Sequence, residues 1–352
     1  MRPVAVRLFH AESVAVDGPL ERRLATLRGE LAGRLADAFR GAGADDVAVV
    51  SGPRDDTPFG RRLRDLVLRE RPAGLIVAGS GSLALARPAD LRPFLNTAAA
   101  GELVALANNQ FSADAVAIAC AERLVDLPDL PADNALPRWL AEVAGYRVTD
   151  LAGRSRLQID VDGPLDALIA GVPWPDPDEV ARAAVALDAV AAVADDQRAE
   201  LLVSGRTSAR SLAWLERRLP ARVRALVEER GLRASAGQAR ADGLPNRRPP
   251  ASVLGLVLDE LGAAALGAIV ARLGDGALID TRVLLAHRLD ADERSWPLPE
   301  DRFASDLLLP ERIADPWLRE LTASAVAAPV PIVLGGHSLV GPALPLALGR
   351  RR

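Results

Sequence analysis

The chain has 352 residues, of which 49% are apolar and 26% charged, and its formal net charge is −4 at neutral pH. This length exceeds one ordinary core, so we expect two domains. The negative balance argues against nucleic acid as a partner, because such binders need a basic face. One cysteine, Cys120, excludes an internal disulfide and a multi-cysteine metal site. No leader and no long uncharged apolar run is found, so a cytoplasmic protein without a membrane segment is expected.

The sequence contains no lysine, and all 43 of its basic residues are arginine. Lysine Schiff bases, a Walker-type lysine and a lysine general base are therefore excluded. Arginine, backbone amides or a metal ion must hold any bound phosphate or carboxylate. Genome composition and life at high temperature both explain such a bias, and the sequence does not separate them.

Strands and helices alternate through the first half. We expect strands at 4–9, 44–51, 74–78, 102–107, 147–150 and 157–160. Helices are expected at 20–39, 60–69, 88–98 and 137–144, whereas 115–123 fits either a helix or a strand. This alternation predicts a three-layer α/β domain with a mostly parallel sheet.

A proline-rich stretch at 171–178 interrupts the pattern, and we place the boundary there, between domains at 1–172 and 173–352. The second half again reads as α/β. Strands are expected at 200–204, 222–228, 277–280 and 330–334, and helices at 179–198, 207–218, 252–261, 263–273 and 311–324. Residues 235–251 have the composition of a loop.

Three strings in the first half occur in an order typical of one family. They are Ala11-Glu12-Ser13 with Gly18-Pro19-Leu20-Glu21-Arg22, then Gly81-Ser82-Leu83 through Pro88-Ala89-Asp90-Leu91, and finally Asp160-Val161-Asp162-Gly163-Pro164-Leu165-Asp166. In these motifs the first half resembles nucleotidyltransferases of the glycosyltransferase-A-like fold, such as phospholactate guanylyltransferase and the molybdenum-cofactor nucleotidyltransferases. The resemblance covers slightly under half of the chain. It implies the fold of the nucleotide-diphospho-sugar transferases, a nucleotide or nucleotide-linked substrate, and Mg²⁺ held by Asp160 and Asp162.

Two departures from the family pattern bear on activity. Glu12 stands where the family has a lysine that holds the triphosphate, and Ser82 stands where it has its first metal-binding aspartate. An anion at the first position repels phosphates, and an uncharged hydroxyl is a poor Mg²⁺ ligand. The resemblance therefore implies altered or weak transferase activity. The alternative is a non-catalytic protein that uses the same fold for ligand sensing or assembly.

Two loops of the first half carry candidate substrate contacts to a small, anionic ligand. The glycine-serine run Gly79, Ser80, Gly81 and Ser82 follows a strand, and its amides could cradle an anion. Asn108, Asn109 and Asp114 follow another strand and could read a base or a sugar. Each has a plainer alternative, a tight crossover for the first loop and a surface turn for the second. Likewise, Asp162 could simply be the N-cap of a helix beginning at Pro164.

The second half resembles no family that we recognise, but polar residues follow its expected strands. Arg206, Asp280 and His337 directly end or follow strands, and Arg282 and Arg302 lie nearby in the sequence. An enzyme with its site in this half is a further alternative, with His337, Asp280 and Arg282 as catalytic candidates and Arg206 and Arg302 as substrate contacts. The plainer alternative is local capping, with His337 shaping a turn.

Overall fold

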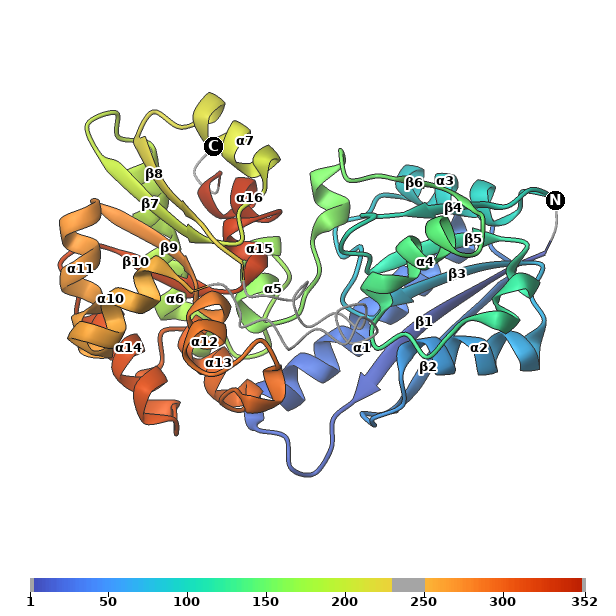
Figure 1. Cartoon of the computed structure of the whole chain (residues 1–352), viewed down its shortest axis with the longest axis horizontal. Coiled ribbons are helices and arrows are strands. Elements are labelled where there is room, and N and C mark those ends of the chain that lie inside the picture. The colour runs from blue at the N-terminus through green and yellow to red at the C-terminus, as the bar shows by residue number, and fades with distance from the viewer. Residues whose placement is uncertain (1–2, 230–250, 350–352) are drawn as a thin grey trace. The chain divides into compact units, whose positions relative to one another are not determined.

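The computed structural model describes residues 3–229 and 251–349, so the loop expected at 235–251 lies almost wholly outside the described residues (Figure 1). The chain is α/β throughout and forms two compact units. The first unit comprises Met1–Gly18 and Arg22–Asp162, and the second comprises Pro19–Glu21 and Gly163–Arg352. The division falls after Asp162 rather than at 172, because helix α5 (Pro164–Ala170) packs on α6 (Pro177–Ala194).

The first unit is built on a six-stranded sheet. Its strands are β1 (Val4–Glu12), β2 (Asp46–Pro53), β3 (Gly74–Gly79), β4 (Val104–Ala107), β5 (Ala115–Ala119) and β6 (Arg147–Asp150). Its helices are α1 (Pro19–Gly41), α2 (Phe59–Glu70), α3 (Pro88–Ala98) and α4 (Leu136–Glu142), with the first three residues of α1 counted in the second unit. All the strands and helices expected in this half are present except one strand. Residues 157–160 form no strand, because a 3₁₀ turn at Ser155–Gln158 takes their place.

The sheet is mixed, with strand order β2-β1-β3-β5-β4-β6. Strand β5 runs antiparallel to both of its neighbours, and the other pairs are parallel. A mostly parallel sheet was expected, and this is correct except for β5. The reversal occurs because the short loop at 108–114 returns the chain beside β4, as in a hairpin, without a crossover helix.

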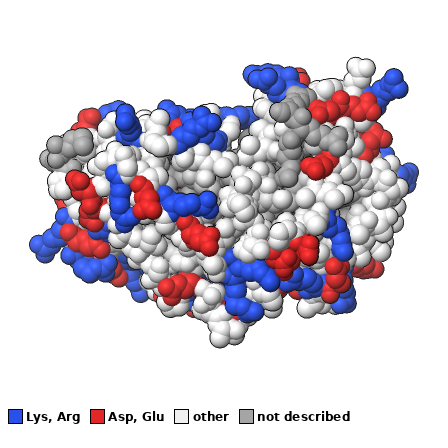
Figure 2. Space-filling view, turned by 180° about the vertical axis from the view of Figure 1, so that it is seen from behind, with Lys and Arg blue, Asp and Glu red and all other residues white. Residues whose placement is uncertain are grey.

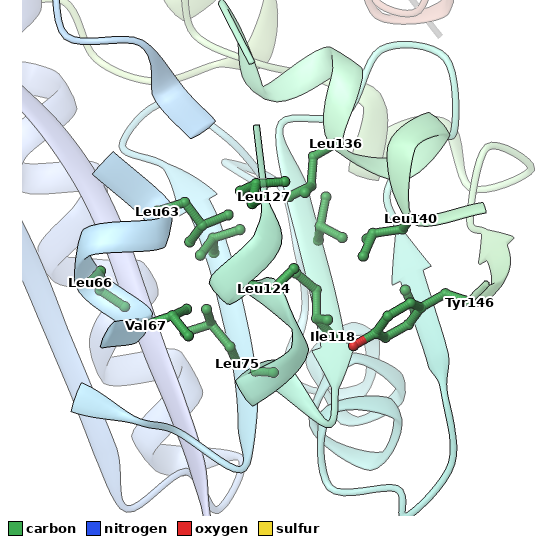
Figure 3. Packing of buried hydrophobic residues seen from close by; sticks show 14 of the residues in the cluster. Leu63, Leu66, Val67, Leu75, Ile118, Leu124, Leu127, Leu136, Leu140 and Tyr146 are labelled. Carbon is green, nitrogen blue, oxygen red and sulfur yellow. The ribbon is translucent and has the colours of Figure 1, made fainter. Parts of the chain in front are cut away.

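Helices cover both faces of this sheet, and the strand residues alternate between two apolar clusters. On β3, Leu75 and Val77 join a cluster with α2 and α4, whereas Ile76 and Ala78 join a cluster with α1 and α3. Figure 3 shows the first cluster, whose members include leucines of α2 and α4 and Ile118 of β5. Strands buried on both faces need near-continuous apolar runs, which explains the sequence of β3 and β5.

The ends of three strands define the edge of the first sheet where polar residues gather. Strands β1, β3 and β4 run in the same direction, so the loops after them emerge at one edge. Ser80 N donates to Phe9 O at 2.9 Å, and Asn108 N donates to Ala115 O at 2.9 Å. We call this the carboxyl edge of the first sheet.

The second unit contains a parallel four-stranded sheet of order β10-β9-β7-β8. Its strands are β7 (Glu200–Gly205), β8 (Arg222–Val227), β9 (Gly276–Asp280) and β10 (Ile332–Gly335). Besides α5 and α6 its helices are α7 (Ala209–Arg218), α10 (Val253–Leu261), α11 (Leu266–Leu273), α12 (Thr281–Arg288), α13 (Pro299–Asp306), α14 (Pro316–Val326), α15 (His337–Val340) and α16 (Leu344–Leu348).

The described residues also bear on membrane-spanning potential and surface charge. Among the described helices, no single one combines the length and apolar composition of a membrane span; the pair α10 and α11 does so together, but it is bent by 113°. Acidic and basic side chains are interspersed on the face shown in Figure 2.

Candidate functional site

The glycine-serine loop after β3 lies against the chain at Asp160 and Val161. Val161 N donates to Gly81 O at 3.1 Å. A Cβ added to Gly81 would lie 2.6 Å from Val161 O and 2.7 Å from Asp160 Oδ1, so only glycine allows this approach. Ser80 and Ser82 are both buried, and Ser82 Oγ donates to Gly79 O at 2.8 Å. The Ser82 hydroxyl thus closes a turn.

Arg28, from the middle of α1, brings a positive charge to this loop. Its Nη1 lies 3.4 Å from Asp162 Oδ1. Its Nε is buried and has no hydrogen-bond partner, and a Cβ on Gly81 would lie 3.2 Å from it. Burial alone would lower the pKa of Arg28, but surrounding carboxylates raise it: those of Asp162, Asp160, Asp114 and Asp133.

The carboxyls around Arg28 hold their protons unusually firmly. Burial, followed by repulsion from Asp162 and Asp114, raises the pKa of Asp160 well above its usual range. Burial also raises the pKa of Asp114, to about 7, although a hydrogen bond from Asn108 opposes the shift. The pKa of Asp133 is raised mainly by burial. Asp160 Oδ1 is buried without a hydrogen-bond partner. The cluster therefore holds more carboxyl groups than the charge of Arg28 offsets.

Asn108 supports this cluster through the hydrogen bonds of its side-chain amide. Its Nδ2 donates to Asp114 Oδ2 and to Leu157 O, both at 3.1 Å. Its Oδ1 accepts from the backbone N of Asp114 and of Ala115, at 3.0 and 3.1 Å. An amide side chain has two donor hydrogens and two acceptor positions, so all are in use. The expected substrate contact by Asn108 is thus corrected to a positioning role for Asp114.

Asn109 and Phe111 lie on the same loop. Asn109 Oδ1 accepts from Phe111 N at 2.9 Å, which closes a turn. The Phe111 ring is 78% exposed. Phe111 was not among the residues singled out in this loop from the sequence, because its exposure is visible only in the structure.

His10 and Glu12 lie near the end of β1. The His10 ring packs on α1, where a Cβ added to Gly29 would lie 3.2 Å from Nε2. Burial and the neighbouring Arg28 lower the pKa of His10, and Glu12 acts in the opposite direction. His10 Nδ1 is buried without a hydrogen-bond partner. Glu12 itself is exposed and pairs in register with Pro53.

The motif at Asp160–Asp166 leads into helix α5. Helix α5 does begin at Pro164, but its N-cap is Gly163, so the expectation of an Asp162 cap is wrong. Asp162 instead pairs with Arg28. Among the described residues, no group of three or more His, Cys, Asp or Glu is arranged to enclose a metal ion.

Four of the five candidate residues of the second unit lie at one sheet edge: Arg206, Asp280, Arg282 and His337. Arg206 Nε and Nη2 donate to the two carboxylate oxygens of Asp280, at 2.6 and 3.1 Å. Burial would raise the pKa of Asp280, but Arg206, His337 and Arg282 hold it below its usual value. Arg282 also pairs with the buried Asp306, at 2.5 and 2.6 Å.

Arg302, the fifth candidate, flanks this group through Arg282. Burial and the Arg282 charge lower the pKa of Arg302. Its Nη1 donates to Glu293 at 3.1 Å, and its guanidinium lies 5.6 Å from the centre of the Trp296 ring. Its Nε is buried and has no hydrogen-bond partner.

No family model matches this chain, and no curated protein matches it. The α/β fold by itself is shared by many functions. The residues at the two sheet edges are therefore the observations that bear on function.

Proposed function

We propose that the first unit binds a nucleotide, or a nucleotide-linked small molecule, together with Mg²⁺ at the carboxyl edge of its sheet. One observation carries the proposal. A buried donor, Arg28 Nε, and a buried acceptor, Asp160 Oδ1, both lack a hydrogen-bond partner and both border Gly81. Buried polar atoms without partners are rare and need an explanation, and a ligand that meets both would provide one.

The chemistry of these two atoms favours a phosphate with a divalent cation. A guanidinium N–H suits a phosphate oxygen, and an ionised carboxylate oxygen suits a hard cation. Mg²⁺ is usually held by one or two carboxylates together with substrate phosphates. Asp160 and Asp162 fit that open arrangement, which needs no group of three protein ligands. When bound, the ion would supply positive charge to the phosphates.

Phe111 supports a nucleotide rather than a bare phosphate. Its exposed ring lies on the loop that ends at Asp114, one of the carboxyls around Arg28. Every nucleobase has a flat π-face that stacks on an aromatic ring, and such stacking contributes about 1–3 kcal/mol. The ligand would then combine a base at the loop with phosphates near Gly81.

Catalytic turnover is expected to be weak or absent. Glu12 places a negative charge at the end of β1, and the Ser82 hydroxyl is occupied by Gly79 O. Two groups that the family uses on the triphosphate and the metal are therefore missing. These observations favour the second candidate function, ligand sensing without chemistry at the same site.

A thermal-shift experiment on the full chain tests the binding proposal. Nucleoside triphosphates with MgCl₂ should raise the unfolding midpoint, since ligand at 100 times its Kd adds about 2.7 kcal/mol. Asp160→Asn should abolish that shift yet remain folded, because asparagine has nearly the same size and burial already favours the neutral form of Asp160. Asp37→Asn, which removes an exposed partner of Arg40, is the matched control. An Asp160→Asn shift equal to that of the wild type contradicts the proposal.

A second set of variants distinguishes binding of the nucleobase from binding of the phosphates. Phe111→Ala should weaken nucleoside triphosphate binding about tenfold or more and leave inorganic triphosphate binding unchanged. Val143→Ala, at another exposed apolar position, should change neither. Pyrophosphate release measures turnover. Robust Mg²⁺-dependent release that survives Asp160→Ala would refute the roles assigned here.

A further inference from the structure

The second sheet has a topological switch point. The chain adds β8 on one side of β7, then returns to pair β9 on the other side and β10 beyond it. Connections that leave two neighbouring strands in opposite directions open a crevice outside their carboxyl ends, where α/β proteins bind ligands. Here that position lies beyond Gly205 of β7 and Asp280 of β9.

The loop that leaves β7 at this point holds an unsatisfied hydroxyl. Thr207 is 8% exposed, and its Oγ1 is buried without a hydrogen-bond partner. Ser208 follows as the N-cap of α7, with its Oγ accepting from Ser211 N at 3.1 Å. The first amides of a helix have no partner within the helix and attract negative charge. Thr207 therefore lies next to a set of donors that point out of the helix end.

Charged groups surround this switch point in near balance. Asp280 accepts from the backbone N of Arg206 and of Arg282, at 3.4 and 3.2 Å, besides its pair with the Arg206 side chain. The Arg282 guanidinium is neutralised by Asp306, and Asp166 also acts on it. His337 acts on Asp280 from the start of α15. Because Asp280 already offsets Arg206, recognition here must depend on the unused donors rather than on net charge.

We propose that the switch point of the second sheet binds the oxyanion group of a small ligand, a phosphate or a carboxylate, through the Thr207 hydroxyl and the first amides of α7. Arg206 borders the oxyanion while it remains paired with Asp280. The ligand must be rich in acceptors, because a hydroxyl and backbone amides are what the loop offers. This site lies wholly within the second unit and does not depend on the function proposed for the first.

The test is a phosphate titration of the full chain in EDTA, followed by ³¹P line broadening, with acetate as a second arm. Thr207→Val keeps the shape and removes only the hydroxyl. We expect phosphate affinity to fall about tenfold, the loss of one hydrogen bond to a charged group. The unfolding midpoint without ligand should stay the same or rise, because the variant no longer buries an unsatisfied hydroxyl.

Thr322→Val is the matched control. The Thr322 hydroxyl is also buried, but it donates to Leu318 O at 2.7 Å and lies 2.8 Å from Ser305 Oγ. Its removal should lower the midpoint and leave phosphate affinity unchanged. Equal affinity in wild type and Thr207→Val overturns the proposal, as does a wild type that binds neither anion at millimolar concentrations. Phosphate binding lost in Asp160→Asn but kept in Thr207→Val would assign the anion to the first unit.

Discussion

Asn108 and Asp114 show how one residue can set the ionisation of another. The Asn108 amide contacts the Asp114 carboxyl and its backbone N, and so fixes it in the buried cluster around Arg28. The carboxyl remains costly to ionise there, since burial outweighs that hydrogen bond and raises its pKa to about 7. A divalent cation bound nearby would lower the free-energy cost of ionising Asp114. The raised pKa of Asp114 is therefore consistent with the Mg²⁺ proposed for the first unit.

The raised pKa of Asp114 predicts how stability depends on pH. Between its ordinary pKa of 3.8 and about 7, the unfolded chain has lost this proton while the folded protein keeps it. The folded state then binds more protons, so the free energy of unfolding falls as the pH rises, by up to about 1.4 kcal/mol per pH unit for one such group. Asp160 and Asp133 shift in the same direction.

Thermal unfolding at several pH values checks this expectation. Asp114→Asn should weaken the decline between pH 4 and pH 7 and should be more stable than the wild type at pH 7 and above. Asp37→Asn, at a surface pair on α1, should follow the wild type. A wild-type midpoint that rises steadily over this range would rule out the protonated cluster.

At the scale of elements, glycines mark where a helix meets another segment at backbone distance. Gly60, at the start of α2, is buried, and its N donates to Leu130 O at 2.9 Å. A Cβ at this position would lie 2.1 Å from Pro128 O and 2.4 Å from Leu130 N. Gly33, inside α1, has nothing within 4 Å of a Cβ. Glycine at position 60 therefore allows close packing of α2, whereas glycine at position 33 only adds to the conformational entropy lost when α1 folds.

These two glycines predict opposite effects of alanine on stability. Gly60→Ala forces backbone to move and should destabilise by about 1–3 kcal/mol or more. Gly33→Ala should stabilise by about 0.5–1 kcal/mol, because alanine favours the helix interior. Urea unfolding of both variants measures the difference. A Gly60→Ala variant as stable as the wild type would show that α2 does not pack on residues 128–130 as described.

At the scale of the whole molecule, each unit has its own sheet and its own polar edge. Cys120 lies directly after β5 in the first unit and is 8% exposed, with its Sγ 3.8 Å from Glu102 O. A thiol reagent can reach it only when this part of the unit opens. Its labelling rate is therefore a local probe of the first core.

Ile118→Ala should speed that labelling. Ile118 is fully buried in the cluster of Figure 3, so its truncation should cost about 2–5 kcal/mol and raise the population of open states accordingly. Val143→Ala removes an exposed apolar side chain and should label at the wild-type rate. Rapid labelling of the native wild type would contradict the burial of Cys120.

The sequence by itself determined the α/β class and nearly all the strands, because a strand buried on both faces must be a continuous apolar run. It also marked Gly79–Ser82 and Asp160–Asp162, since glycine runs and paired carboxylates are local features. Helices α12 and α13 were not anticipated, because the residues at 281–288 and 299–306 were considered only for their polar side chains beside buried strands.

Only the tertiary structure decided which residues meet. Arg28 looks like any other arginine of α1 in the sequence, yet its Nη1 lies 3.4 Å from Asp162 Oδ1, far along the chain. The direction of β5 and the pairing of Arg206 with Asp280 likewise depend on strand order. Local patterns fix which segments are apolar, whereas the meeting of distant charges depends on how those segments pack, and no local pattern contains that information.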